Sequence, residues 1–174
     1  YNRKNIEILN KDILDYNIDS KIKYKIISNL PYNISSKFLL KYLKLNTNIS
    51  EIICMIQSEL ANKFDLKYGK MNKYKFLANL CSEYEIKFNV SRNVFLPKPK
   101  VESKVVGFKL KKNNLDERRL EFFIRFFFIN KRKKIKSNKK FINNIDKKFL
   151  NCRYEELSFK ELFKIYKRFE FSVS

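Results

Sequence analysis

The residues in this chain whose types and order suggest chemistry are Asn29, Leu30, Pro31 and Tyr32, which follow the apolar run YKIIS. They place an amide oxygen, a backbone carbonyl and an aromatic ring within four residues, and the proline fixes φ at about −65° without adding an N–H group. Ligands of open α/β sheets bind beyond the carboxyl ends of the strands, where this segment is expected to lie. Taken alone, the same residues also fit a strand that ends in a proline turn.

Two other groups of residues could bind a ligand. Asp12 follows the apolar run IEIL, and a basic run extends from Lys131 to Lys136. An aspartate in that position is commonly a solvated turn residue, and a basic run is commonly the solvated face of a helix. Only their order relative to Asn29 and its neighbours raises either above that reading.

The three cysteines, Cys54, Cys81 and Cys152, are odd in number and widely spaced. They fit neither a disulfide framework nor a zinc motif, so no metal site is expected. A reducing compartment is the expected setting, whether cytoplasm, organelle or nucleolus. The most apolar run, residues 122–129, is interrupted by Arg125 and is far shorter than the roughly 20 residues of a membrane span, so we expect no membrane partner.

The chain of 174 residues carries a formal net charge of +21. Such a charge suits a protein that binds nucleic acid or an anionic membrane surface. A codon bias towards Lys, Asn, Ile, Phe and Tyr would account for part of the same excess. Hydrophobic residues make up 44% of the chain, which is enough for a real core, so the chain is expected to fold.

The elements that would position these residues change in kind along the chain. Up to about Lys112, strand-like runs alternate with helix-like ones, which predicts an α/β sheet with parallel strands. Ser35 is the expected N-cap of the first helix. The strand-like runs are IEIL (6–9), YKIISNL (24–30), EIICMIQ (51–57), EIKFNVS (85–91) and KVVGFKLK (104–111), and the helix-like runs are SSKFLLKYL (35–43) and KYKFLANLCSEY (73–84).

Beyond residue 113 the pattern indicates helices only. LEFFIRFFFIN is apolar on more than one face and is expected to be a buried helix. SFKELFKIYKRF begins with a capping box formed by Ser158 and Glu161. We therefore predict two units, residues 1–113 and residues 114–174.

Four segments, in this order, resemble a single family. Residues 29–32 resemble the Asn/Asp-x-Pro-Tyr/Phe motif of S-adenosylmethionine-dependent methyltransferases that act on the exocyclic amine of adenine. With NKDIL (10–14), FLPKPKVES (95–103) and NKRKKIKSN (130–138), they resemble the ribosomal RNA adenine dimethyltransferases, the KsgA and Erm group. The resemblance implies a Rossmann-like methyltransferase sheet in the first unit and a small helical RNA-binding domain in the second.

The resemblance also implies roles for the residues around Pro31. The Asn29 side-chain oxygen and the Leu30 carbonyl would hold the two N–H groups of the adenine amine and favour a tetrahedral nitrogen with its lone pair aimed at the methyl group. Pro31 would shape this pair, Tyr32 would stack on the base, and Phe95 would close its other side. Phe95 also fits an ordinary loop aromatic that packs on the sheet.

The implied cofactor is S-adenosylmethionine. Asp12 would accept from the amine of its adenine, the Ile13 N–H would lie beside it, and Asn29 would border it. The implied partner is ribosomal RNA in a precursor of the small subunit, bound by a monomer. The basic residues that would contact this RNA are Lys98, Lys100, Lys131, Arg132, Lys133 and Lys134.

The chain departs from the family pattern in its glycines. The glycine-rich cofactor loop and the acidic residue about twenty positions later are missing, and neither Gly69 nor Gly107 is placed for that role. We therefore expect the first two strands of the family's sheet to lie upstream of Tyr1. We also expect the 174-residue chain alone to bind the cofactor poorly or not at all, and to be inactive by itself.

The function implied is dimethylation of adenine amines in small-subunit ribosomal RNA, as part of ribosome biogenesis. The Leu in NLPY and the KsgA-like basic segment favour this function over that of an Erm-type methylase of the large subunit. A different class is a ribosome-assembly or transcription factor that keeps the fold and has lost catalysis. Intact Asn29, Pro31 and Tyr32 argue against it, because a binding protein has no need of that acceptor geometry.

Overall fold

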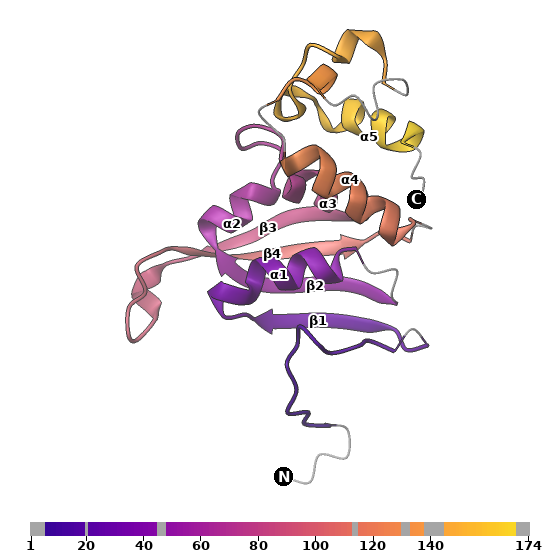
Figure 1. The fold of residues 1–174 in the computed structure, drawn as a ribbon. Coiled ribbons are helices and arrows are strands. Elements are labelled where there is room, and N and C mark those ends of the chain that lie inside the picture. The colour runs from indigo at the N-terminus through magenta and orange to yellow at the C-terminus, as the bar shows by residue number, and fades with distance from the viewer. Residues whose placement is uncertain are drawn as a thin grey trace.

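A computed structural model describes residues 6–19, 21–44, 48–112, 115–129, 133–137 and 145–169. In this part of the chain, a four-stranded sheet has the strand order β1-β2-β4-β3 (Figure 1). Its strands are β1 (Tyr24–Asn29), β2 (Ile49–Gln57), β3 (Ser82–Val90) and β4 (Ser103–Leu110).

The sheet is mixed. β1 pairs with β2 in parallel, whereas β4 pairs antiparallel with both β2 and β3. The expected parallel direction is therefore confirmed for β1 and β2 and is wrong for the pairs that β4 forms. β3 and β4 follow each other through one loop without a crossover helix, and such a connection gives antiparallel neighbours. The α/β class, with a Rossmann-like arrangement, is confirmed.

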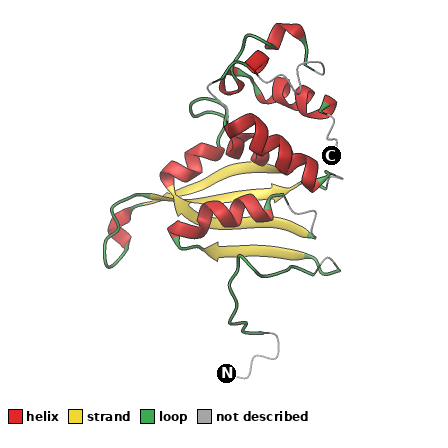
Figure 2. Ribbon diagram, viewed as in Figure 1, coloured by secondary structure: helices red, strands yellow, loops and turns green. Residues whose placement is uncertain are grey.

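Helices α1 (Tyr32–Tyr42), α2 (Ser58–Phe64) and α3 (Lys73–Cys81) pack on one face of this sheet (Figure 2). On that face the cross-strand pairs Ile52–Phe108 and Cys54–Val106 are almost fully buried. The alternate residues point to the other face, where Ile27 is 81% exposed. The helix α2 was not predicted from the sequence, since its seven residues are too short for a clear period.

The expected strand at residues 6–9 does not form. Ile8 is 89% exposed, and among the described residues β1 pairs with β2 alone. A strand is stable only when its backbone groups find a partner, so an apolar run without one remains extended coil. The chain that follows it is tied to α1 instead, where the Tyr42 hydroxyl donates to the Ile13 carbonyl at 2.7 Å.

Helix α1 begins at Tyr32, three residues before the predicted N-cap at Ser35. Pro31 occupies the N-cap position with φ −54° and ψ 136°, a φ that is preorganised for helix initiation. Ser35 lies inside the helix, where its hydroxyl donates to the Pro31 carbonyl at 3.0 Å. The early start places Tyr32 in the first turn, directly after the end of β1.

The C-terminal part contains α4 (Glu117–Ile129) and α5 (Phe159–Arg168), with short 3₁₀ segments at Ile135–Ser137, Lys147–Phe149 and Tyr154–Glu156. The predicted capping box is confirmed, because Glu161 N–H donates to the Ser158 hydroxyl and Ser158 N–H donates to the Glu161 carboxylate. The boundary near residue 113 stays a prediction. No helix in the described ranges is long and apolar enough to cross a membrane.

Aromatic rings join the C-terminal helices to α3. The fully buried Phe76 ring lies 5.2 Å from that of Phe123 on α4 and 6.0 Å from that of Tyr166 on α5. Arg119 on α4 also donates to the Tyr166 and Lys167 carbonyls at the end of α5, at 2.8 and 3.0 Å. The sheet, its helices and the C-terminal helices therefore share one core.

Candidate active site

A cavity of about 360 Å³ lies beyond the carboxyl end of β1. It brings together all five residues predicted to be catalytic, from two segments distant in the sequence. Their chemical roles stay predictions. The lining residues are Asn29, Leu30, Pro31, Tyr32, Met55, Phe95, Pro97 and Pro99.

Alternation along β1 orients the first two of these residues. Asn29 is the last residue of the strand and is exposed, whereas Leu30 is buried in the core. The buried leucine fixes the backbone, and the amide beside it remains free to meet a ligand. Met55 faces Asn29 in the parallel register of β2, so both strands deliver a side chain to the same edge of the sheet.

The Pro31 carbonyl is engaged within the helix. It accepts from Ile34 N–H at 3.1 Å, from Ser35 N–H at 3.2 Å and from the Ser35 hydroxyl at 3.0 Å. The turn thus directs this oxygen along α1 and away from a ligand. The acceptors predicted for the ligand are the two groups that precede it, the Asn29 amide oxygen and the Leu30 carbonyl.

The Tyr32 ring is held from across the sheet. Its hydroxyl lies 2.7 Å from the hydroxyl of Ser103, a fully buried residue at the start of β4. Because a buried hydroxyl that has found a partner is costly to move, this contact fixes the ring at the wall of the cavity. Ser103 was not predicted as a functional residue. Its place at the end of FLPKPKVES, a segment that resembles the family, could have indicated a role at the site.

Met55 is a lining residue that sequence reasoning missed, as are Pro97 and Pro99. It could have been found from its place near the carboxyl end of EIICMIQ, the run after the one that carries Asn29. Finding it requires the register of β1 against β2, which the apolar pattern of either strand alone does not supply.

The loop between β3 and β4 brings Phe95 to the cavity, where it is half-buried. Two contacts of Glu102 hold the loop at its base. Its carboxylate accepts from Arg92 N–H at 2.8 Å, and its carbonyl accepts from Ser58 N–H at 2.9 Å. Lys98 and Lys100 are exposed, each next to a proline that lines the cavity.

The residues predicted to bind the cofactor adenine lie elsewhere. Asp12 is exposed and accepts from Leu14 N–H at 2.8 Å in a turn, and the Ile13 carbonyl accepts from the hydroxyl of Tyr42. Tyr42 is the last residue of α1 and Tyr32 is the first, about 15 Å apart at 1.5 Å per residue. Asp12 and Ile13 do not line the cavity beside Asn29, and their role in binding the cofactor stays a prediction.

The predicted basic segment is only partly described. Lys131 and Arg132 lie outside the described residues, whereas Lys133 and Lys134 are exposed. The expectation of a helix over this segment is wrong for residues 133 and 134. Lys134 forms an isolated β-bridge with Arg153, which requires extended backbone.

The chemistry of the cavity is that of uncharged groups. Its lining residues include no acid, lysine or cysteine, and no cluster of His, Cys, Asp and Glu in the described ranges could hold a metal ion. Burial raises the pKa of both the Cys54 and the Cys81 thiols to about 12, so neither is a nucleophile near neutral pH. The site can accept hydrogen bonds from a polar group and hold a flat ring.

Comparison with known proteins gives concordant matches. Residues 2–169 match the family described as ribosomal RNA adenine dimethylase. The chain is 42% identical, over 159 residues, to ribosomal RNA small subunit methyltransferase A of Malacoplasma penetrans, a match that covers 88% of this chain and 54% of the relative. The chain spans about half the length of the curated relatives it matches.

Two solved structures share the fold at 19% identity. They are a dimethyladenosine transferase from Plasmodium falciparum, with a TM-score of 0.75, and the 23S rRNA methyltransferase ErmE, with a TM-score of 0.71. Each match covers 94% of this chain and 72% of the other.

Proposed function

The chain belongs to the ribosomal RNA adenine dimethylase family, and we propose that it serves the transfer of methyl groups from S-adenosylmethionine to the exocyclic amine of adenine in ribosomal RNA. The observation that carries this proposal is the cavity beyond β1. There Asn29 and Leu30, which carry the two predicted acceptors, line the same space of about 360 Å³ as Tyr32 and Phe95. Uncharged acceptors between two rings suit an amine on a flat base.

The acceptor pair addresses the difficulty of the reaction. The lone pair of the adenine amine is delocalised into the ring, so the nitrogen is a poor nucleophile. Two acceptors that each hold one N–H group favour a tetrahedral nitrogen, whose lone pair is then localised and aimed. S-adenosylmethionine would supply the methyl group as an electrophile and would leave as S-adenosylhomocysteine once its S–C bond breaks. The amine proton displaced by the new N–C bond would pass to solvent, because the lining residues include no acid or lysine.

The rings select and orient the base. An adenine must leave its helix or loop to reach such a site, and stacking against a fixed ring lowers the cost of extruding it. Tyr32 is suited to this task because Ser103 holds its hydroxyl at 2.7 Å. Of the residues predicted to bind the cofactor, Asn29 alone borders the cavity. We therefore assign the cavity to the adenine of the RNA and not to the cofactor.

We further propose that the substrate is small-subunit ribosomal RNA during ribosome biogenesis, bound by a monomer in a reducing compartment. The support is the 42% identity to a relative that is named for the small subunit. The fold alone does not select a subunit, since its solved neighbours include the 23S rRNA methyltransferase ErmE.

The test is mass analysis of nucleosides from unmethylated small and large ribosomal subunits, each incubated with S-adenosylmethionine. Both the 174-residue chain and any longer protein in which it naturally occurs should be used. We expect dimethyladenosine in small-subunit RNA only. Product in the large subunit alone would overturn the choice of substrate, and RNA binding without product in either would favour a non-catalytic assembly factor.

A further inference from the structure

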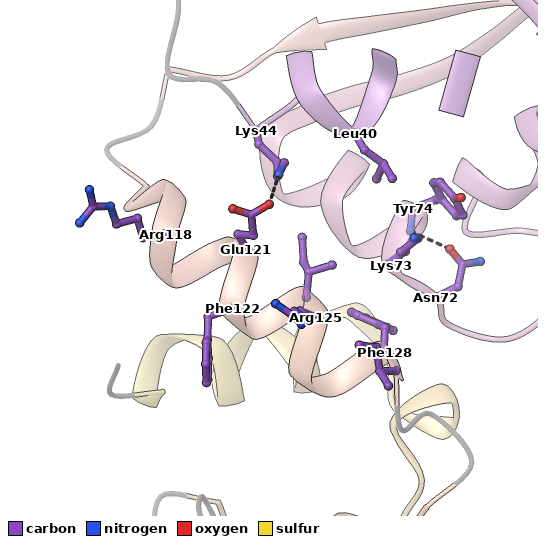
Figure 3. A pocket seen from close by; sticks show the side chains of 12 residues that line it. Leu40, Lys44, Asn72, Lys73, Tyr74, Arg118, Glu121, Phe122, Arg125 and Phe128 are labelled. Atoms are coloured by element: carbon purple, nitrogen blue, oxygen red, sulfur yellow. Dashed lines mark hydrogen bonds and ion pairs between the residues drawn. The ribbon is translucent and has the colours of Figure 1, made fainter. Parts of the chain in front are cut away.

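A second, larger hollow lies on the helical side of the molecule. It has a volume of about 700 Å³, and α4 forms one wall while α1 and the start of α3 form the other (Figure 3). None of its lining residues belongs to the cavity beside Asn29. We call it the α4 groove.

The charges that line the α4 groove are mostly positive. Lys44, Lys73, Arg118 and Arg125 line it, against the single carboxylate of Glu121. Lys44 pairs with that carboxylate at 2.9 Å across the groove (Figure 3). For Lys73, Arg118 and Arg125, no ion pair with a carboxylate of the described residues is found. Three cations are thus available to an anionic occupant.

Cationic and apolar residues alternate along α4. Arg118, Phe122, Arg125 and Ile129 follow one another at intervals of four, three and four residues, which places them on one stripe of the helix. Arg118 and Arg125 are therefore about 10 Å apart along the helix axis, close to the length of three stacked nucleotides at 3.4 Å each. Phe122, part of whose ring is exposed, lies between them.

The wall opposite α4 is fixed by polar contacts. Asn72 caps α3 by accepting from Tyr74 N–H at 2.8 Å, and the Tyr74 hydroxyl lies 2.9 Å from that of Ser36 on α1. Ser36 is one helical turn from Tyr32, on the same face of α1. The Tyr74 end of the groove therefore lies one turn from the wall of the adenine cavity.

We propose that the α4 groove binds a single-stranded segment of RNA, with phosphates on Arg118, Arg125 and Lys73 and a base against the Phe122 ring. Cationic side chains interleaved with aromatic rings are what a single strand requires, since every base offers a flat face and every linkage a charge. A duplex would hide its bases from Phe122. RNA as the occupant rests on the proposed function, whereas the contacts of the groove do not.

The test uses the full chain and the anisotropy of a labelled ten-nucleotide single-stranded RNA. In the first variant, Arg118→Gln is combined with Arg125→Gln, which removes both charges and keeps helix propensity. The matched control combines Lys160→Gln with Lys164→Gln, two exposed residues of α5 outside the groove. We expect the arginine pair to weaken binding tenfold or more and to reduce the salt slope by about 1.4, and the control to change neither beyond twofold.

A second variant tests the stacking. Phe122→Leu keeps apolar contact with Phe126 and Phe169, whose rings lie 6.0 and 5.9 Å away, and loses the flat face. We expect it to weaken single-strand binding about fivefold or more and to reduce the quenching of a 2-aminopurine placed in the strand.

Three results would overturn the proposal. The first is an equal loss of RNA affinity in the control pair, and the second is an equal loss of affinity for a duplex of the same sequence. The third is displacement of the RNA by an acidic amphipathic helical peptide at a lower concentration than by unlabelled RNA. Methyl transfer is scored separately. If the groove variants weaken binding while the unaltered chain and its longer forms give no dimethyladenosine, the proposed function fails and the groove assignment stands. If methyl transfer is present and its KM is the same in all variants, the groove assignment fails.

Discussion

The cavity beside Asn29 and the α4 groove differ in the chemistry of their walls. The cavity is lined by uncharged residues alone, whereas four cations line the groove. A methyl-accepting amine must be held in one geometry, which directional hydrogen bonds provide, and a nearby lysine would compete for the same acceptors. A polyanion is held by charges whose attraction tolerates many geometries. Under the two proposals, the cavity orients the reacting amine and the groove provides affinity for the RNA.

They also differ in how their walls are supported. The cavity depends on one turn between β1 and α1 and on the contact between Tyr32 and Ser103. The groove depends on the seating of α4 against α3, which aromatic packing provides through Phe76 and Phe123. Each difference can be challenged by substitutions that act on one hollow only.

The largest effect is expected from Phe76→Ala. Removing this buried ring leaves a void between α3 and the C-terminal helices, and the free energy of unfolding should fall by about 3–5 kcal/mol. Urea denaturation measures it. The matched control is Phe88→Ala, whose ring is 59% exposed on the open face of the sheet and should cost far less. Equal losses for the two variants would show that the C-terminal helices do not depend on this packing.

Asn29→Ala should come next and act on the chemistry alone. Loss of one preorganised group that stabilises a transition state lowers kcat by roughly 100- to 1,000-fold. Because Asn29 lies outside the α4 groove, RNA affinity should stay within twofold. Kinetics of methyl transfer and anisotropy measure the two effects, and the control is Asn33→Ala, at an exposed residue in the first turn of α1. A parallel loss of affinity would mean that the two hollows are not separate.

A smaller effect is expected from Ser103→Ala. A hydrogen bond between two hydroxyls is worth about 1 kcal/mol, so methyl transfer should slow by about fivefold. Tyr32→Phe should have a similar effect, and the double variant should be no worse than either single one, because all three lack the same contact. Additive losses in the double-mutant cycle would contradict the role of Ser103 in positioning the ring.

The smallest effect is expected from Glu121→Gln, which removes the carboxylate of the groove. Its pair with Lys44 is largely exposed on the glutamate side, so stability should change by less than about 1 kcal/mol. RNA affinity should rise by about two- to threefold at low salt, as the released Lys44 joins the available cations, and the gain should vanish at high salt. A decrease in RNA affinity would show that the ion pair matters more for the shape of the groove than for its net charge.

The cavity was the more predictable of the two hollows, for a physical reason. Asn29 to Tyr32 are contiguous, so one turn brings them together, and of the five residues predicted to be catalytic only Phe95 had to come from elsewhere. The capping box at Ser158 could be predicted for the same reason, because its two residues are only three positions apart in the sequence. The α4 groove has no local motif, since residues such as Lys44 and Arg125 come to line one hollow only when helices distant in the sequence pack together.

The wrong expectations share a cause as well. The strand at residues 6–9 and the parallel direction of the later strands both depend on pairing partners, which an apolar run does not specify. The predicted N-cap at Ser35 is wrong because Pro31, four residues earlier, is the N-cap of the helix. Ser103 and Met55 were not predicted because each reaches the site from another strand, Ser103 from β4 and Met55 from β2.

Helix α1 contributes to both hollows, with Tyr32 at its first residue and Lys44 just beyond its C-terminal end. A helix has no flexible joint within its length, so the rise per residue fixes Tyr32 at about 15 Å from Tyr42, and Lys44 follows two residues after that end. Helix α1 therefore sets the spacing between the two hollows. Under the two proposals, an RNA fills both hollows at once only when its unpaired flank lies at about this spacing from the reactive adenine, and an RNA with a shorter or longer span fills only one of them.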